Sequence, residues 1–234
     1  MRIDKYLTEC GFGSRSEVKK MIKSGTVYAD GIKVKSDDMK VDEEKSVIEV
    51  NGKRAEYKKY RYYVMNKPAG VITAVSDKKD KRVFDILPDW VIKKELAPVG
   101  RLDKDTEGVL VFTNDGEFSH KILAPKSHID KVYYLQLEKE ISSEEIERLK
   151  SGVEIEGGYI TKEAEAEKIG EKEIYLTIRE GKFHQVKQMA EAIGNKVTYL
   201  KRVKFSQMTE NFHIRYLLQS HILTKFIIFN LRRR

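Results

Sequence analysis

The spacing of apolar positions divides the chain into a short N-terminal unit and a longer second unit. In residues 1–50 it predicts two short helices followed by strands, the last of them at Val47–Val50. The second helix is expected to begin at Ser14, where Glu17 completes a capping box, and to end near Gly25. Its apolar face consists of Val18, Met21 and Ile22. The Asp30-Gly31 pair then predicts the turn of a hairpin.

Beyond residue 59, strand and helix patterns alternate irregularly. Strands are predicted at Tyr62–Met65, Val109–Phe112, Lys131–Leu137 and Ile174–Ile178. Helices are predicted at Glu117–Leu123, Ser142–Lys150 and His184–Gly194. The order shows no βαβ rhythm, and no glycine-rich nucleotide loop is present. The expected fold class is therefore α+β, with a mixed and mostly antiparallel sheet.

Polar residues at 51–60 indicate a linker, so we place a domain boundary between residues 58 and 59. This gives an N-terminal domain at 1–58 and a second domain at 59–234. Trp90 is expected to pack in the core of the second domain. Residues 206–234 form an atypical tail whose apolar positions have no clean period, and a helix from Tyr216 to Leu231 is the element they best suit.

Charge narrows the classes of partner. The chain has a net charge of +8, and residues 195–234, with nine Lys or Arg and one Glu, carry all of it (9 − 1 = +8). Any interaction with nucleic acid must therefore depend on local patches. Cys10 is the only cysteine, and the five histidines have no zinc-like pairing, so we expect no disulfide, no metal and no cofactor. No apolar run reaches membrane-spanning length, and we expect a cytoplasmic protein with no membrane contact.

Basic residues follow one flank of the second helix. Arg15, Lys19 and Lys23 lie four residues apart, and Arg2 and Lys5 precede them in the first helix. Such a flank beside a hairpin suits the phosphate backbone of structured RNA. A solvated helix face would have the same pattern.

The charged loop Gly100–Gly108 is the strongest candidate for chemistry. It holds two bases and three acids and leads into the strand Val109–Phe112. A carboxylate on a tight turn at the start of a strand can serve as nucleophile, general base or metal ligand. The spacing does not choose between Asp103, Asp105 and Glu107, and a solvated loop remains the ordinary alternative.

Two resemblances decide between these alternatives. The first covers Ile3-Asp4-Lys5-Tyr6-Leu7, Gly11, Ser14-Arg15-Ser16-Glu17, Ile22, Gly25, Val27 and Asp30-Gly31. In this order these residues resemble the alpha-L RNA-binding module, which a small-subunit ribosomal protein shares with several RNA-modifying enzymes. The resemblance implies that Arg2, Lys5, Arg15, Lys19 and Lys23 bind RNA.

The second resemblance rests on four segments. They are Asn66-Lys67-Pro68-x-Gly70, Gly100-Arg101-Leu102-Asp103-x-x-Thr106-x-Gly108, Lys131-x-Tyr133 and Glu180-Gly181-Lys182-x-His184-Gln185-Val186-Lys187. Together they resemble the RsuA-like pseudouridine synthases, bacterial enzymes that modify ribosomal RNA. The resemblance implies the pseudouridine synthase fold, conversion of a uridine in RNA to pseudouridine, and no cofactor.

The resemblance also assigns roles. Asp103 corresponds to the family's nucleophile, Lys187 to its basic partner and Tyr133 to its active-site tyrosine. Arg101 is a hypothetical wedge that stacks where the target base has turned out. Lys67 and Pro68 are expected to shape the cleft wall.

Segments around Glu117-Phe118-x-His120 and Pro125-Lys126-x-His128 look more like the small-subunit enzymes. The expected substrate is therefore 16S ribosomal RNA or an assembling ribosomal subunit, bound by a monomer. The alternatives are a 23S-specific enzyme, a non-catalytic RNA-binding assembly factor, and a metal-dependent nuclease that uses Asp103, Asp105 and Glu107.

Overall fold

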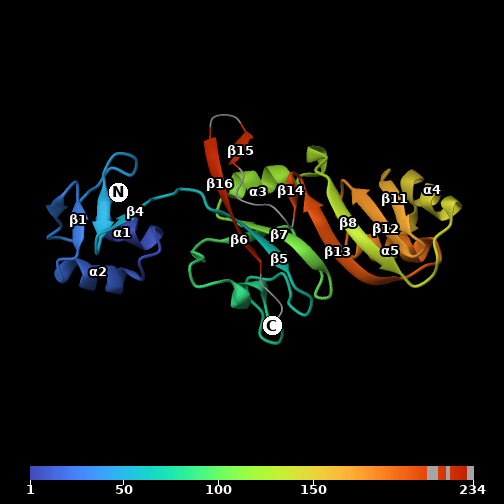
Figure 1. Ribbon diagram of the computed structural model, residues 1–234, viewed down its shortest axis with the longest axis horizontal. Helices are drawn as coiled ribbons and strands as arrows, with labels where there is room; N and C mark the ends of the chain where they lie inside the picture. Colours follow the sequence, from blue (N-terminus) through green and yellow to red (C-terminus); the bar gives the residue numbers. More distant parts are fainter. Residues whose placement is uncertain (210–215, 220–221, 231–234) are drawn as a thin grey trace. The chain divides into compact units, whose positions relative to one another are not determined.

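The computed structural model describes residues 1–209, 216–219 and 222–230 of the 234-residue chain. It divides into two compact units, which Figure 1 shows in sequence colours. The first comprises Met1–Tyr60 together with Leu87–Leu96, and the second comprises Arg61–Ile86 with Ala97–Arg234. The inclusion of Leu87–Leu96 in the first unit is a tertiary feature that the sequence pattern did not indicate.

The first unit contains two helices and a four-stranded antiparallel sheet. The helices are α1 (Ile3–Glu9) and α2 (Arg15–Lys23), and the sheet order is β2-β1-β3-β4. These strands are β1 (Val27–Ala29), β2 (Ile32–Lys33), β3 (Ile48–Val50) and β4 (Lys53–Ala55). The capping box of Ser14 and Glu17 is formed as predicted, and it satisfies free backbone N–H groups at the start of α2. The predicted linker contains β4, because Asn51-Gly52 turns the chain back onto β3.

The second unit is built on a ten-stranded sheet with the central order β11-β12-β8-β13-β7-β5-β16-β15. The strands of this order are β5 (Tyr62–Lys67), β7 (Glu107–Thr113), β8 (Lys131–Leu137), β11 (Glu165–Gly170), β12 (Glu173–Ile178), β13 (Val197–Phe205), β15 (Tyr216–Gln219) and β16 (Ile222–Asn230). Two short strands, β6 (Ala97–Val99) and β14 (Met208–Thr209), pair with β7 and β13. Only the β13–β7 and β16–β5 pairs of this sheet are parallel, which confirms a mixed, mostly antiparallel α+β fold.

Helices and turns connect these strands. They are the 3₁₀ turns at Val83–Ile86 and Pro125–Ser127, and the helices α3 (Gly116–Leu123), α4 (Ser143–Ser151) and α5 (Gln185–Ala192). A small hairpin, β9 (Glu154–Ile155) with β10 (Tyr159–Ile160), follows α4. Helix α5 buries the apolar side chains of Val186, Met189 and Ala190.

Two predictions about packing were wrong. Trp90 is half exposed rather than in the core of the second unit, because Leu87, Val91 and Leu96 occupy the buried positions of its segment. The tail does not supply a helix between Tyr216 and Leu231 as far as the structure describes it. It forms β15 and β16 instead, and β16 adds to β5 in parallel. A run of β-branched and aromatic residues without helical period favours a strand once an open sheet edge is available. The basic end, residues 231–234, lies outside the described residues.

Across the described residues, no helix is both long enough and apolar enough to cross a membrane.

Candidate active site

The Asp103 loop lies between β6 and β7, and the Lys67–Thr73 segment fixes its backbone. The Thr73 hydroxyl donates to the Leu102 carbonyl (2.8 Å), and the Leu102 N–H donates back to Thr73 Oγ1 (3.2 Å). The Gly70 N–H donates to the Lys104 carbonyl at 2.7 Å. The Asp103 carboxylate therefore lies on a loop whose backbone is hydrogen-bonded to the neighbouring Lys67–Thr73 segment.

The side chain of Lys67 adds further hydrogen bonds to the backbone of the Asp103 loop. Its side chain is fully buried, and Nζ donates to the carbonyl oxygens of Asp103 (2.9 Å), Thr106 (2.8 Å) and Pro68 (3.1 Å). Burial lowers the pKa of Lys67 from its usual 10.5 to about 8, although the nearby charge of Asp103 opposes the shift. Lys67 thus supports the loop from inside the protein, and its role in shaping a cleft wall stays a prediction.

One row of residues crosses the sheet at the site. Tyr133 on β8 is opposite Arg202 on β13, Arg202 is opposite Gly108 on β7, and Gly108 is opposite Lys67 on β5. Residues directly opposite each other point to the same face of a sheet. The side chains of Tyr133, Arg202 and Lys67 therefore share one face, and all three are buried.

Gly108 is the one position of this row that has no side chain. Its φ is +108°, and a Cβ built there would lie 2.1 Å from the backbone oxygen of Arg202. The two halves of the sheet meet at this point, since β13 and β7 are paired only through Lys201–Glu107 and Arg202–Gly108. Glycine is therefore required for close approach of the two strands.

Arg202 is a buried cation at this junction that sequence reasoning missed. It is 2% exposed, and its Nε donates to the Val109 carbonyl on β7 at 2.8 Å. Its guanidinium also stacks over the Phe205 ring, 4.8 Å from the centroid. Within the described part of the chain, Nη2 has no hydrogen-bond partner. The run Lys201-Arg202-Val203-Lys204 resembles a solvated basic stretch, and only the two-residue spacing from the buried Leu200 indicated an inward side chain.

Lys187 on α5 joins two of the three loop acids. Its Nζ lies 3.4 Å from Asp103 Oδ2, and it donates to both oxygens of Asp105, at 2.7 and 2.9 Å. Asp105 is therefore the nearer partner, whereas the resemblance had paired Lys187 with Asp103. Partial burial acts to raise the pKa of Asp105, but the hydrogen bond and charge of Lys187 outweigh it and lower that pKa below its usual value.

His184 also approaches the nucleophile candidate. Its Nε2 lies 3.5 Å from Asp103 Oδ1. The residue has a left-handed backbone (φ 47°) and immediately precedes α5. This conformation is uncommon outside glycine, and the imidazole of the residue that adopts it lies beside the Asp103 loop. The quoted motif contained His184 without assigning it a role.

The three acids of the loop do not converge. Glu107 accepts a hydrogen bond from the Tyr199 hydroxyl at 2.9 Å, and it precedes Gly108 on β7, so its side chain points to the opposite face from the row. Among the described residues, no group of three His, Cys, Asp or Glu side chains is arranged to hold a metal ion. The geometry therefore does not favour the ligand set on which a nuclease would depend.

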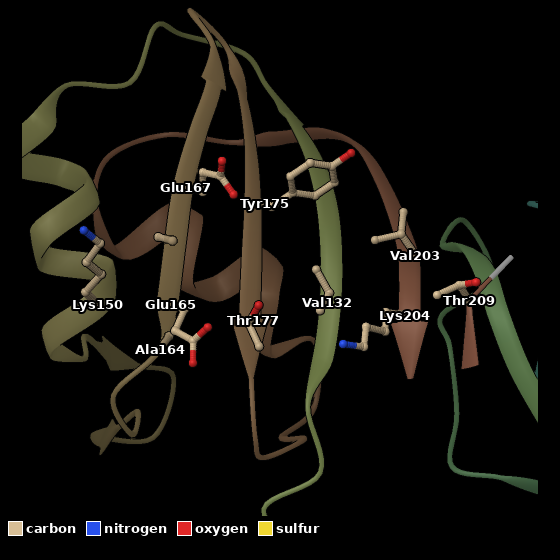
Figure 2. A pocket seen from close by; sticks show the side chains of 11 residues that line it. Val132, Lys150, Ala164, Glu165, Glu167, Tyr175, Thr177, Val203, Lys204 and Thr209 are labelled. Atoms are coloured by element: carbon tan, nitrogen blue, oxygen red, sulfur yellow. The ribbon is translucent and has the colours of Figure 1, made fainter. Parts of the chain in front are cut away.

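Tyr134, next to the site tyrosine, has the alternate orientation expected of a strand. Its hydroxyl donates to Glu173 (2.9 Å), and its ring packs near those of Tyr175 and Tyr199. This opposite face carries a shallow hollow of about 740 Å³ near Val132, Tyr175 and Lys204 (Figure 2). The hollow contains both acidic and basic side chains and none of Asp103, Tyr133 or Lys187, so it is separate from the candidate site.

The predicted RNA-binding residues gather in the first unit. Arg2, Lys5, Arg15 and Lys19 line a hollow of about 550 Å³ between α1 and α2, together with Asp4 and Ser16. Carboxylates neutralise part of this positive charge. Lys19 forms an ion pair with Asp37 at 2.8 Å, and Arg2 forms one with Asp4 at 3.1 Å. Lys23 is exposed farther along α2 and does not line the hollow, while Arg101 is exposed in the Asp103 loop.

Comparison with known proteins agrees with this arrangement. Residues 61–192 match the model of the RNA pseudouridylate synthase family, and residues 1–47 match the S4 domain. A Bacillus subtilis protein named as an uncharacterized RNA pseudouridine synthase, YtzG, is 47% identical over 89% of each chain. The small-subunit pseudouridine synthase A of Vibrio cholerae is 38% identical over 89% of this chain and 90% of its own. A crystal structure of a pseudouridylate synthase superposes with a TM-score of 0.60 at 31% identity, covering 89% of this chain and 90% of that one.

The fold, the clamped aspartate loop and these matches define an RNA-modifying isomerase. The chain belongs to the RNA pseudouridine synthases, in the RsuA-like family that carries an N-terminal S4 domain. The expected family, fold class and enzyme class are thereby confirmed.

Proposed function

We propose that this enzyme converts one uridine of 16S ribosomal RNA to pseudouridine with Asp103 as the nucleophile. The observation that carries the proposal is the position of Asp103. Its backbone carbonyl accepts a hydrogen bond from Lys67 Nζ at 2.9 Å. Its carboxylate oxygens lie 3.4 Å from Lys187 Nζ and 3.5 Å from His184 Nε2. A carboxylate on a fixed backbone with a cation alongside is held in one orientation, as a nucleophile must be.

The proposed chemistry needs no external reagent. The Asp103 carboxylate bonds to C1′ of the ribose as the bond between C1′ and N1 of the uridine breaks. The base then turns, C5 displaces the Asp103 oxygen and bonds to C1′, and the proton from C5 is returned to N1. In this scheme the Lys187 ammonium supplies a positive charge beside the Asp103 carboxylate. Tyr133, in the buried row beside Arg202, stacks on the base and offers its hydroxyl for proton transfer.

Binding of the RNA is assigned to the first unit and to the loop. We propose that Arg2, Lys5, Arg15, Lys19 and Lys23 contact phosphates of folded RNA. Such contacts position the substrate without reading its sequence. Arg101, exposed in the Asp103 loop, is proposed to occupy the space that the turned-out uridine leaves.

The choice of the small-subunit target depends on the sequence around α3. The relatives do not decide it by identity, since the large-subunit synthase B of Bacillus subtilis is 37% identical over 88% of this chain. The Glu117-Phe118-x-His120 segment on α3 and the following Pro125–Ser127 turn favour the small-subunit enzymes. A uridine of 23S ribosomal RNA is the alternative target. We further propose that the enzyme acts as a cytoplasmic monomer.

The proposal predicts one new pseudouridine when the protein is incubated with unmodified ribosomal RNA. Sites should be mapped across 16S and 23S RNA, on free RNA and on assembling subunits. We expect a single site in the small-subunit RNA, and none with the Asp103→Asn variant, because the amide is not a nucleophile. A new pseudouridine in 23S RNA instead would show that the target is wrong, while the proposed mechanism would still hold.

Two outcomes would overturn more than the target. Tight binding without any new pseudouridine would indicate a non-catalytic assembly factor. RNA cleavage that disappears after exhaustive chelation would indicate a metal-dependent nuclease, whereas the proposed isomerase should not respond to chelation. An Asp105→Asn variant serves as the matched control, since it changes the neighbouring acid that also contacts Lys187. If Asp105→Asn were inactive and Asp103→Asn active, the nucleophile would be wrongly assigned.

A further inference from the structure

Phe183 is an exposed aromatic residue directly before α5. Its side chain is 74% exposed, the highest value among the exposed large hydrophobic residues that the structure describes. A single exposed apolar side chain is ordinary in soluble proteins. Its surroundings, however, differ from those of a residue left in solvent by chance.

The ring of Phe183 extends a stack that begins at the nucleophile candidate. It lies parallel to the imidazole of His184, with centroids 3.8 Å apart and an interplanar angle of 22°. The same imidazole lies 3.5 Å from Asp103 Oδ1. Phe183 is therefore one ring farther from Asp103 than His184, with most of its surface open to solvent.

The backbone that carries Phe183 is fixed on both sides. Gln185 is 3% exposed, and its amide donates to Glu180 (2.6 Å) while its carbonyl oxygen accepts from the Lys182 N–H (2.9 Å). The Gln188 side chain donates to the Phe183 carbonyl at 3.0 Å. A large apolar ring held out of the core on a fixed backbone is pre-organised to bind a flat partner.

The charges around the ring indicate what that partner is. Lys182, the preceding residue, holds its ammonium 4.1 Å from the Tyr159 ring centroid. Lys187, whose ammonium pairs with Asp105 and Asp103, lies in the first turn of α5. Flat aromatic surface next to fixed cations is the combination that binds single-stranded nucleic acid, by base stacking and phosphate contact. When a uridine turns out of its stack, the adjacent base loses a neighbour and has a free face.

We propose that Phe183, backed by His184, is a stacking site for the nucleobase next to the target uridine. The inference rests on the proposed function, because it takes Asp103 as the position of that uridine. In this view the enzyme replaces one lost base–base contact with a protein ring, and it selects RNA in which the flanking nucleotide is unpaired.

The first test measures stacking without turnover. The probe is a short single-stranded RNA with one uridine and 2-aminopurine on its 5′ or 3′ side, bound to the Asp103→Asn protein. We expect 2-aminopurine fluorescence to be quenched on one side of the uridine. Quenching should persist with Phe183→Tyr and disappear with Phe183→Ala. The matched control is Ile160→Ala, another exposed apolar residue (68%), on β10, which should change nothing. Equal quenching with Phe183→Ala and the parent protein would overturn the proposal.

The second test uses turnover of the mapped ribosomal RNA fragment. Replacing the flanking nucleotide with an abasic one should lower kcat/KM of the wild-type enzyme roughly 5- to 100-fold, as expected for one lost stacking contact. The Phe183→Ala enzyme should be reduced by a similar factor on intact RNA and show no further loss on the abasic RNA. If the Phe183→Ala enzyme lost a further factor in kcat/KM on the abasic RNA, the two effects would be independent. That result would overturn the proposal and leave Phe183 as a surface for a protein partner. Quenching without any turnover would support the stacking site while the proposed function fails.

Discussion

At the scale of single residues, Lys67 shows how a buried ammonium group can hold a loop in place through hydrogen bonds. A buried ammonium is costly unless its protons are hydrogen-bonded. Here four carbonyl oxygens lie within hydrogen-bond distance of the ammonium, and three of them, from Asp103, Lys104 and Thr106, belong to the loop that holds the candidate nucleophile. The group stabilises the loop by its hydrogen bonds, while the desolvation of its charge opposes folding.

This balance predicts a pH dependence of stability. The pKa of Lys67 is about 8 in the fold and 10.5 normally, so between these values the unfolded chain binds more protons than the folded one. The contribution of Lys67 to stability therefore increases with pH in this window, by at most about 1.4 kcal/mol per pH unit. Below pH 8 both states are protonated, and the contribution is constant.

Urea unfolding of the wild type and of Lys67→Met at pH 7.0 and 9.5 checks this prediction. Other lysines and tyrosines titrate in both proteins and cancel in the difference. We expect Lys67→Met to be less stable by about 2–4 kcal/mol at pH 7, because it leaves buried carbonyls without donors. The deficit should grow at pH 9.5. A difference that is constant or shrinks with pH would contradict the buried, charged state of Lys67.

At the scale of elements, the critical contact is the short parallel pairing between β13 and β7. It joins the half of the sheet that contains Tyr133 to the half that follows Asp103. Gly108 allows this pairing, and the Nε of Arg202 reinforces it through the Val109 carbonyl. The relative position of the two proposed catalytic residues thus depends on one strand junction.

A Gly108→Ala change tests this junction. The added Cβ would lie 2.1 Å from the Arg202 oxygen, and the backbone cannot move without separating the strands. We expect a loss of roughly 3 kcal/mol or more in the free energy of unfolding, beyond the roughly 1 kcal/mol that a positive φ alone costs.

Gly70→Ala is the matched control for this change. Gly70 has a similar φ of +86°, but no atom lies within 4 Å of a Cβ built there. Thermal and urea unfolding of both variants should therefore separate backbone strain from steric conflict. If the two variants lost the same stability, the close approach of β13 to Gly108 would not be the limiting feature.

At the scale of the whole molecule, the proposed RNA-binding residues of α1 and α2 and the proposed catalytic residues belong to two different units. The basic hollow between α1 and α2 belongs to the first unit, and the Asp103 loop belongs to the second. Variants in the hollow should therefore change RNA affinity and leave kcat on bound RNA unchanged.

Arg15→Gln and Lys19→Gln test this division. Each removes one proposed phosphate contact, so the slope of log affinity against log salt should fall by about 0.9 per contact on duplex RNA. Lys45→Gln, an exposed lysine of the same unit outside the hollow, is the control. Unchanged salt slopes for Arg15→Gln and Lys19→Gln would place the phosphate contacts elsewhere.

The sequence by itself determined the family, the α+β class and the position of the Asp103 loop. Those features depend on local signals: the capping box at Ser14, the alternating strand at Lys131–Leu137, and four motifs whose order is readable along the chain. Tyr133 and Tyr134 could be placed on opposite faces because side chains alternate along any strand.

Only the tertiary structure decided which residues meet. Arg202 is buried beside Tyr133 because β13 pairs with both β8 and β7, and its partners Tyr133 and Gly108 lie 69 (202 − 133) and 94 (202 − 108) residues away along the chain. Lys187 contacts Asp105 more closely than Asp103, and the tail forms strands because β5 offers it a free edge. These outcomes depend on long-range pairing, which local propensity and periodicity do not encode.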